Sequence, residues 1–394
     1  MRVLAMTSLF PNPYQPNKWS PNQQQLRWLA ERVPVDVIAP LPWTSELKGK
    51  RSDGNLMLSG RHRQLDNLNI EHPRYWFLPG MLRGSSGRFY RWSVRKTFEK
   101  HVSEFKPDIV FTQWAYPDGW AAVKLGQSAG LPVVLQVLGS DVLLLHEHPG
   151  RTAGTLEALK EADGIWAVSQ DLAGKIEQLG IAAERIRVIY DGVDPKVFHP
   201  GDQQDARRRL GLDPDKKIIL FVGNLATVKA LDKLLQACEQ LKNERIEFNT
   251  AIIGQGELLQ TLEQQRQGLS CREQVKLYGS MPQDTLPDWY RAADVFVLPS
   301  YSEGVPNVLL EASACGLPYV ASNVGGIPEI AQRGNGTLVP SGDVPALSAA
   351  IRQTLLQPRP TATPVRTRAE CINDFLTFLG EVHARFHDGR ISPK

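Results

Sequence analysis

The segment DVFVLPSYSEGVPNVLLEASACGLPYVASN, residues 294–323, indicates the fold class because its sequence predicts a strand, a loop, a helix and a second strand in succession. Its first seven residues form a short apolar run that predicts a buried strand, and NVLLEASAC predicts a helix. Pro306 suits the first turn of that helix, and Gly316 with Pro318 ends it before the next apolar run. This order of elements predicts a parallel sheet covered by helices.

The same alternation extends over the chain in two series. The strands expected in the first series are RVLAMTS (2–8), VDVIAP (35–40), DIVFTQ (108–113), PVVLQVLG (132–139), GIWAVS (164–169) and IRVIYDG (186–192). Helices are expected at SPNQQQLRWLAERV (20–33), WAAVKLGQSAG (120–130) and SQDLAGKIEQLG (169–180). The second series begins with strands at KIILFVGN (217–224), FNTAIIG (248–254) and QVKLYGS (274–280). The chain therefore repeats one α/β architecture.

The length of 394 residues fits two domains rather than one core. Residues 191–217 are rich in proline, glycine and charge and predict an interdomain linker. Their Asp213-Pro214-Asp215 sequence indicates a solvated turn, and no metal is expected there. The predicted domains are 1–195 and 196–360, both Rossmann-like, followed by a helical segment, 361–394, that packs back on the first domain.

Composition and cysteine spacing indicate a soluble protein of a reducing compartment. The chain is 42% hydrophobic and 22% charged, and no run reaches the roughly 18 apolar residues of a membrane-spanning helix. Its cysteines, Cys238, Cys271, Cys315 and Cys371, have spacings that suit neither a zinc site nor a disulfide framework. No secretory signal is visible after Arg2. We therefore expect a cytoplasmic protein.

The positive charge is concentrated near the start of the chain. Residues 1–100 hold 16 Lys and Arg against 7 Asp and Glu, although the whole chain carries only +3. Basic and aromatic side chains alternate over residues 83–100. They comprise Arg83, Arg88, Phe89, Tyr90, Arg91, Trp92, Arg95, Lys96, Phe98 and Lys100. This pattern fits either a solvated helix face or a surface for anionic lipid headgroups or a phosphorylated acceptor. No nucleic-acid-reading module accompanies it.

The loop before NVLLEASAC has the features of a phosphate site. Unpaired backbone N–H groups around Gly304 to Val308, to which Pro306 contributes none, meet the positive end of the helix, and glycine allows a phosphate to approach closely. Two carboxylates flank the site, so Glu303 and Glu311 should bind neutral hydroxyl groups of a sugar or ribose. Taken singly, Glu303 could be an exposed loop acid and Glu311 could serve the helix dipole.

A second anion-binding loop is expected after the strand 217–224. It contains Gly223-Asn224, and Lys229 follows just before a helix, where a point charge suits phosphate. The next strand is followed by Gly254 and Gly256. A dinucleotide fingerprint needs a third glycine at the position of Leu259, so hydride transfer to a nicotinamide cofactor is disfavoured.

With these motifs, the chain resembles the retaining glycosyltransferases of family 4, which have the GT-B fold. The resemblance rests on FVGNLATVKALDKLL, IIGQGEL, ADVFVLPS and the two glutamates eight positions apart in SEGVPNVLLEA. It implies two Rossmann-like domains with parallel sheets facing a central cleft, the first on the acceptor side and the second binding the donor. It also implies a C-terminal helix that crosses back to the first domain.

The resemblance assigns roles to the residues of the donor motifs. Glu311 is expected on the ribose of a sugar nucleotide and Glu303 on the transferred sugar. The backbone of residues 304–307 is expected on the distal phosphate, and Lys229 on the diphosphate. The further donor-binding residues that we predict are Gly223, Asn224, Gly254 and Gly256. Asn224 stands where many relatives carry an arginine.

The first half departs from the family pattern on the acceptor side. WAYPDG (114–119) is similar to a polysaccharide-assembly branch, and Gly139-Ser140-Asp141 also match. Trp19, however, lies near an expected glycine, and Gln113 and Leu138 occupy positions where histidine is usual. We predict Trp19, Gln113, Asp118 and Ser140 on the acceptor side and Asp141 as a residue that orients a sugar hydroxyl.

Together, residues and resemblance predict a metal-independent retaining glycosyltransferase of the hexosyltransferase type. Its donor is expected to be a nucleotide diphosphate sugar, with UDP or GDP as the nucleotide, and no cofactor is expected. The predicted acceptor is a lipid-linked glycan in cell-surface or extracellular polysaccharide biosynthesis, which would place the enzyme in the cytoplasm at the membrane. The alternatives are a non-catalytic sugar-nucleotide-binding subunit that supports a partner transferase, and a sugar-nucleotide epimerase.

Overall fold

The structure, a computed structural model, describes residues 1–15, 19–45, 61–77, 83–145, 149–331 and 335–389. The chain forms two compact units, each with its own hydrophobic core. Unit 1 comprises residues 1–189 and 369–394, and unit 2 comprises residues 190–368. The sequence prediction put these boundaries after residues 195 and 360, so the start of the linker and the Pro-rich segment both belong to unit 2.

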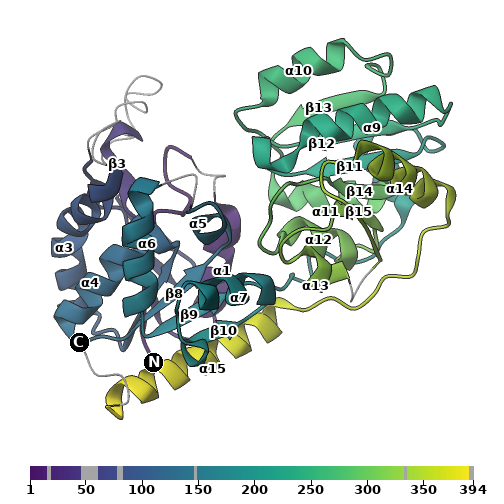
Figure 1. Cartoon of the computed structure of the whole chain (residues 1–394). Helices are drawn as coiled ribbons and strands as arrows, with labels where there is room; N and C mark the ends of the chain where they lie inside the picture. Colours follow the sequence, from purple (N-terminus) through teal and green to yellow (C-terminus); the bar gives the residue numbers. More distant parts are fainter. Residues whose placement is uncertain (16–18, 46–60, 78–82, 146–148, 332–334, 390–394) are drawn as a thin grey trace. The chain divides into compact units, whose positions relative to one another are not determined.

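Unit 1 is built on a sheet with the strand order β10-β9-β8-β7-β1-β2-β5-β4. Figure 1 labels its strands β8, β9 and β10. Its strands are β1 (Val3–Met6), β2 (Val35–Ile38), β4 (His62–Leu65), β5 (Leu68–Glu71), β7 (Ile109–Gln113), β8 (Val133–Val137), β9 (Gly164–Ala167) and β10 (Ile186–Val188). A separate pair consists of β3 (Leu41–Pro42) and β6 (Arg74–Tyr75). Every residue of β1, β2, β7, β8 and β9 is buried, as expected for parallel strands with both faces covered.

The helices of unit 1 surround this sheet. They are α1 (Ser20–Ala30), α3 (Ser86–Glu104), α4 (Trp120–Ala129), α5 (Ser140–Leu143), α6 (Pro149–Glu161), α7 (Gln170–Gln178) and α15 (Arg368–His387), with short helical turns η1 (Arg83–Ser85), η2 (Ala115–Gly119) and η4 (Ala183–Arg185). The C-terminal helix α15, yellow in Figure 1, packs into the core of unit 1. The ring of Phe375 lies 4.7 Å from that of Phe111 and 4.5 Å from that of Trp166, between centroids.

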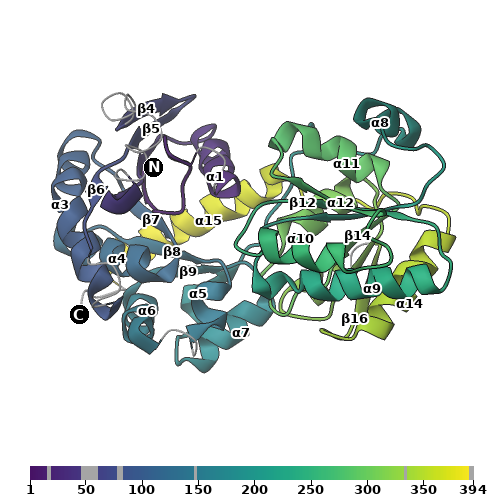
Figure 2. The same cartoon turned by 90° about the horizontal axis from the view of Figure 1, so that it is seen from above.

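Unit 2 contains a sheet with the order β13-β12-β11-β14-β15-β16, and all of its described strand pairs are parallel. The strands are β11 (Ile218–Val222), β12 (Asn249–Ile253), β13 (Val275–Gly279), β14 (Val295–Leu298), β15 (Tyr319–Ser322) and β16 (Gly336–Val339). The helices are α8 (Gln203–Leu210), α9 (Leu231–Asn243), α10 (Leu259–Gln267), α11 (Leu286–Ala292), α12 (Asn307–Ala314), α13 (Ile327–Ala331) and α14 (Val344–Leu356), with turns η5 (Thr227–Lys229) and η6 (Gln283–Thr285). Figure 2 shows α8 with α11 and α9 with α14 on opposite sides of the strands.

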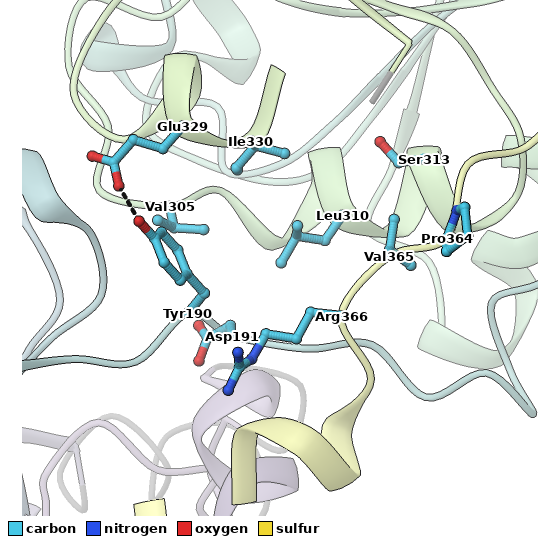
Figure 3. Close-up of a pocket in the computed structure, with 10 residues that line it drawn as sticks. All are labelled: Tyr190, Asp191, Val305, Leu310, Ser313, Glu329, Ile330, Pro364, Val365 and Arg366. Atoms are coloured by element: carbon cyan, nitrogen blue, oxygen red, sulfur yellow. Dashed lines mark hydrogen bonds between the residues drawn. The ribbon is translucent and has the colours of Figure 1, made fainter. Parts of the chain in front are cut away.

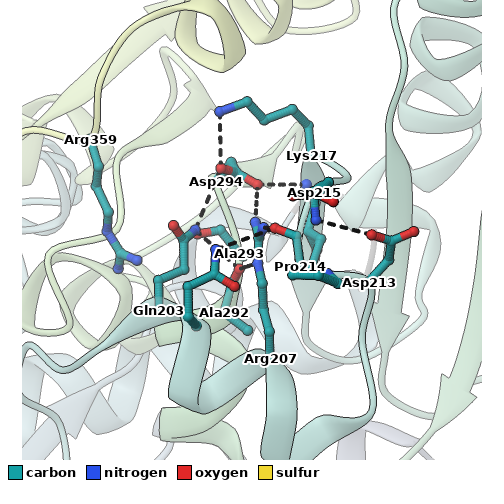
Figure 4. Close-up of polar contacts among 12 residues, drawn as sticks. Gln203, Arg207, Asp213, Pro214, Asp215, Lys217, Ala292, Ala293, Asp294 and Arg359 are labelled. Carbon is teal, nitrogen blue, oxygen red and sulfur yellow. Dashed lines mark hydrogen bonds and ion pairs between the residues drawn. The ribbon is translucent and has the colours of Figure 1, made fainter.

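The helix α8 of the linker is fixed to unit 2 by a buried ion pair (Figure 4). Arg207, of which only 4% is exposed, places Nη2 2.7 Å from Asp294 Oδ2 and donates from Nε to the carbonyl of Ala292. Arg207 Nη1 also donates to the carbonyl oxygen of Pro214. The Asp213 carboxylate accepts a hydrogen bond from the Asp215 N–H, which makes a local turn.

The structure contains elements that the sequence prediction missed. The strands β4 and β5 pair in antiparallel orientation at the edge of the unit 1 sheet, and three of the four β4 side chains are exposed. Such a strand lacks the apolar run on which the strand predictions relied. The strand β16 is also new, because its glycine and partly exposed residues give a weak signal. Within the described residues, no helix combines the length and apolar character that a membrane span requires.

Candidate active site

The predicted donor residues meet at the point in unit 2 where the strand order reverses. The loop after β11 contains η5, and the loop after β14 carries Glu303. Because β11 and β14 are neighbours in the sheet, these loops leave its carboxyl end side by side. The N–H of Tyr301 donates to the carbonyl of Val228 over 2.8 Å, which joins the two loops. A ligand site is expected at such a reversal in an open α/β sheet.

Lys229 and Glu303 form an ion pair across these loops. Lys229 Nζ lies 2.6 Å from Glu303 Oε1, and the two side chains are 19% and 9% exposed. The hydroxyl of Ser300 donates to the same Oε1 atom over 2.6 Å. Among the described residues, none donates to Glu303 Oε2, which therefore remains able to accept a hydrogen bond. The sequence prediction missed Ser300, although it lies only three positions before Glu303.

The N-terminus of α12 follows Glu303 directly. Pro306, which the sequence analysis expected in the first turn, is the N-cap residue directly before Asn307. Within the described part of the chain, the N–H groups of Gly304, Val305, Asn307 and Val308 donate to no protein acceptor. Free N–H groups and the positive end of a helix dipole attract anions.

A glycine pair that the sequence analysis did not single out holds the Glu303 loop in place. The N–H of Gly326 donates to the carbonyl of Gly304 over 2.9 Å. Gly325 has a φ of 53°, and a Cβ atom there would lie 1.9 Å from the carbonyl oxygen of Glu303. Only glycine fits this contact. The Gly-Gly sequence just after β15 is a signal that could have indicated it.

Glu311 lies one turn into α12 and is buried. The hydroxyl of Tyr290 on α11 donates to Glu311 Oε2 over 2.7 Å. Burial raises the pKa of the Glu311 carboxyl to about 7, and the hydrogen bond from Tyr290 lowers it by less. Burial also raises the pKa of Tyr290 well above its usual value. The structure therefore keeps a carboxyl group where its ionisation is unfavourable.

The predicted glycines after β11 and β12 bring two loops into close contact. A Cβ atom at Gly254, whose φ is 152°, would lie 1.8 Å from the carbonyl oxygen of Gly223. A Cβ atom at Gly256 would lie 2.3 Å from the carbonyl oxygen of Leu225. These two glycines therefore face protein backbone. Asn224, in the loop after β11, is exposed.

A cavity lies in unit 2 beside the segment that contains Val305 (Figure 3). It measures about 480 Å³ including its open mouth, and Val305, Leu310 and Ser313 contribute to its wall. Tyr190 and Glu329, joined by a 2.7 Å hydrogen bond, line it as well. The side chain of Val305 points into this cavity, so its expected contribution to an anion site is that of its backbone N–H.

Two predicted acidic residues of unit 1 bind the protein's own loops. Asp118 is fully buried and accepts hydrogen bonds from the N–H and hydroxyl of Ser8 and from the Tyr90 hydroxyl. Asp141 accepts from the N–H groups of Ala115, Leu138 and Gly139. Burial raises the pKa of both carboxyls to about 6.

The other predicted residues of unit 1 differ in exposure. Gln113 is buried and donates through Nε2 to Gln25 Oε1 over 2.5 Å and to Gln136 Oε1 over 3.0 Å. Trp19 is 39% exposed and has a φ of 62°, in the left-handed region. Ser140 is exposed at the start of α5. Gln113 thus belongs to a glutamine cluster, which the sequence analysis had no local signal to detect.

Solved structures define the fold class. Sucrose-phosphate synthase from Thermosynechococcus elongatus superposes with a TM-score of 0.74 and 19% identity, covering 98% of both chains. Alr3699/HepE of Anabaena, solved in complex with UDP and glucose, gives a TM-score of 0.73 with 19% identity, covering 96% of this chain and 99% of that one. The protein therefore has the GT-B fold, with two Rossmann-like domains.

Sequence comparisons then show the family. Residues 22–197 match the family described as glycosyltransferase family 4, and residues 202–373 match glycosyl transferases group 1. The chain therefore carries domains of both of these glycosyltransferase families. It is 28% identical to the "Putative teichuronic acid biosynthesis glycosyltransferase TuaC" of Bacillus subtilis (strain 168) over 89% of this chain and 88% of that protein. It is also 38% identical to the D-inositol 3-phosphate glycosyltransferase of Mycobacterium marinum, over 52% of this chain and only 45% of that protein.

Proposed function

We propose that the protein is a retaining glycosyltransferase that moves a hexosyl unit from a nucleotide diphosphate sugar to an acceptor hydroxyl. The observation that carries this proposal is the grouping of Lys229, Glu303 and the free N–H groups at the start of α12. A cation beside a helix N-terminus suits a diphosphate, and a carboxylate oxygen suits the hydroxyls of a sugar. The complexes of Alr3699/HepE with UDP and UDP-glucose support a UDP-sugar as one candidate donor.

The proposed mechanism relies on positioning and on stabilising the departing diphosphate. Lys229 has three N–H donors, of which one goes to Glu303, so two remain for phosphate oxygens. The N–H groups of residues 304–308 add donors that need no reorganisation during the reaction. With this source of positive charge, the proposed reaction needs neither a metal ion nor a cofactor.

The two glutamates have separate proposed roles. Glu303 Oε1 is held by Lys229 and Ser300, which aims Oε2 at a hydroxyl of the transferred sugar. Glu311 accepts from Tyr290 through Oε2 and offers its other oxygen to the ribose. Gln113 can only form hydrogen bonds at neutral pH, so the proposal assigns it no proton transfer. Asp141 acts by holding the loops on which the acceptor-side residues stand.

The proposed acceptor is a lipid-linked glycan of cell-surface polysaccharide biosynthesis, which the name of the Bacillus subtilis relative supports. The helix α3 offers a surface for the anionic membrane that carries such a lipid. Its exposed face holds Arg88, Trp92, Arg95 and Lys96, and the Trp92 side chain is 69% exposed. The enzyme is then peripheral on the cytoplasmic side, where the four buried free cysteines stay reduced.

A second aromatic group extends this surface. Trp76 is 42% exposed, and its ring stacks on that of Trp43 at 5.9 Å between centroids. The Arg74 guanidinium lies 5.2 Å from the centroid of the Trp76 ring. The N–H of Trp76 donates to the Ser93 hydroxyl, which ties the group to α3. Basic and aromatic side chains together suit a headgroup layer better than basic ones alone.

The experiment is a thermal-shift screen of UDP-, GDP- and dTDP-sugars. A bound donor stabilises the folded protein by about 2.7 kcal/mol at a hundredfold excess over Kd. We expect one nucleotide series to raise the unfolding temperature of the wild type and to raise it less in Lys229→Gln. No shift with any of these sugar nucleotides would overturn the proposal.

A second candidate is a non-catalytic sugar-nucleotide-binding subunit, which the burial of Gln113 at a usual histidine position favours. Both candidates bind the donor, so binding does not separate them. The two candidates are separated by measuring whether free nucleoside diphosphate is released when a membrane extract supplies the acceptor. Tight donor binding without release would favour the subunit, and turnover of the donor without any acceptor would favour an epimerase.

A further inference from the structure

A pocket that measures about 290 Å³ including its open mouth lies in unit 1 beyond the carboxyl ends of β7 and β8. Its wall includes Trp114 directly after β7, Ser140 and Asp141 at the start of α5, and Arg151 and Thr155 on α6. Side chains from three separate elements thus converge on one cavity. The end of a parallel sheet is where α/β proteins bind their ligands.

Arg151 is the basic side chain of this pocket. It is exposed, and within the described residues it forms no hydrogen bond or ion pair. Its guanidinium therefore offers a planar set of donors that matches a carboxylate or a phosphate. Arg151 lies in the first turn of α6 (Pro149–Glu161), where the helix dipole adds positive potential.

The acidic side chain of the pocket does not cancel this charge. Asp141 is buried, with 8% of the residue exposed, and its carboxylate accepts hydrogen bonds from the backbone N–H groups of Ala115, Leu138 and Gly139. These donors offset its negative charge locally. The guanidinium of Arg151, by contrast, has no such compensation among the described residues. An anionic group at the Arg151 end of the pocket is therefore favoured.

Trp114 gives the pocket a surface for a sugar ring. Its backbone has a φ of 83°, which is unusual for a residue with a side chain. Hydrogen bonds from Trp114 N–H to the Gln136 carbonyl and from Gly119 N–H to the Trp114 carbonyl hold it there. An indole face suits the C–H face of a hexose, and the exposed Ser140 hydroxyl can bind a sugar hydroxyl.

We propose that this pocket binds a negatively charged sugar of the acceptor, with Arg151 selecting its carboxylate or phosphate group. The inference rests on the proposed function, since it concerns the acceptor of that reaction. It makes the acceptor an acidic saccharide, and it makes Arg151 a specificity-determining residue that the sequence analysis did not single out.

The test is a calorimetric titration of the full chain with glucose, glucuronate and glucose 6-phosphate at constant ionic strength. We expect at least one charged sugar to bind about tenfold more tightly than glucose, as one charge-assisted contact would provide. Arg151→Gln should remove this preference and leave the affinity for glucose unchanged. Arg63→Gln, which removes the same charge from an exposed side chain of β4 in unit 1, should preserve the preference.

The two charged sugars identify the anionic group that Arg151 binds. A preference for glucuronate indicates a carboxylate, and a preference for glucose 6-phosphate indicates a phosphate. Equal binding of charged and neutral sugars, absence of binding by all three, or a preference that survives Arg151→Gln would overturn the proposal. The same protein is titrated with UDP and GDP. If wild type binds neither nucleotide, the proposed function is contradicted. The sugar preference of wild type and of Arg151→Gln is measured separately, so its outcome does not depend on nucleotide binding.

Discussion

Replacing Glu311 with glutamine should stabilise unit 2 at high pH while weakening donor binding. Glutamine has the same shape, and its side-chain carbonyl can still accept the hydrogen bond from Tyr290. The substitution removes only the charge. At high pH the wild-type Glu311 carboxyl must ionise in a buried position, which lowers the free energy of unfolding. The glutamine of the variant carries no charge, so the variant avoids this loss.

The magnitude follows from the pKa of Glu311, which burial raises from 4.5 to about 7. The folded protein binds the proton of such a carboxyl more tightly than the unfolded chain does. This difference contributes fully to stability below the pKa of the unfolded state, and the contribution is lost as the pH rises through the pKa of the folded state. The window for Glu311 is therefore about pH 4.5 to 7. Between about pH 5 and pH 8, wild type should lose about 2.5 kcal/mol of unfolding free energy relative to Glu311→Gln.

The assay is urea unfolding of both proteins at the two pH values. The transition to follow is the one that added nucleotide shifts to higher urea, because this transition is the unfolding of unit 2. Glu273→Gln is the matched control, because Glu273 lies in the same unit and its side chain is 87% exposed. We expect no pH-dependent difference between that control and wild type. A difference between wild type and Glu311→Gln that stays constant with pH would refute the reasoning.

Three further predictions concern the donor loops and the α3 surface. Glu303→Ala should lower turnover more than nucleotide affinity, since Glu303 faces the sugar, and steady-state kinetics beside nucleotide titration would measure both. Equal losses would indicate structural damage. Changing Arg88, Arg91 and Arg95 together to glutamate should reduce sedimentation with anionic vesicles, and unchanged sedimentation would exclude α3 as the membrane surface. Gly254→Ala should lower nucleotide affinity and destabilise unit 2 by more than about 2 kcal/mol, because its Cβ atom would overlap a carbonyl oxygen. Gly174→Ala on α7, which meets open space, is its control, and equal stability of the two variants would contradict the packing argument.

Much of the fold could be predicted from the sequence, because buried parallel strands are continuous apolar runs. The strands β1, β7, β8, β11 and β14 all follow this pattern and were predicted correctly. The antiparallel strand β4 has mostly exposed side chains, so its place in the sheet depends on pairing with β5, which local sequence does not encode.

The grouping of residues in the candidate donor site could be predicted in part, because most of them lie in two short segments. Glu303 and Glu311 are separated by a loop and one helical turn, so their relation is local. The pairing of Lys229 with Glu303, over 74 positions, depends on the neighbouring places of β11 and β14 in the sheet. Tyr290 could not be predicted, since its contact with Glu311 depends on how α11 packs against α12.

In unit 1, residue type did not indicate the contacts that the predicted side chains make within the protein. Asp118 and Asp141 have the chemistry of ligand-binding groups, but their carboxylates bind backbone and hydroxyl groups of neighbouring loops. Long-range packing decides whether such a side chain faces a ligand or the protein. Arg151 shows the converse, since an ordinary helical arginine lies in a pocket.

The most direct test of the central claim is release of nucleoside diphosphate from the donor selected by thermal shift, measured with and without a membrane extract that supplies acceptor. Wild type should release nucleoside diphosphate only when acceptor is present, and Lys229→Gln should release it far more slowly. Donor binding without acceptor-dependent release, or equal release by wild type and Lys229→Gln, would contradict the account.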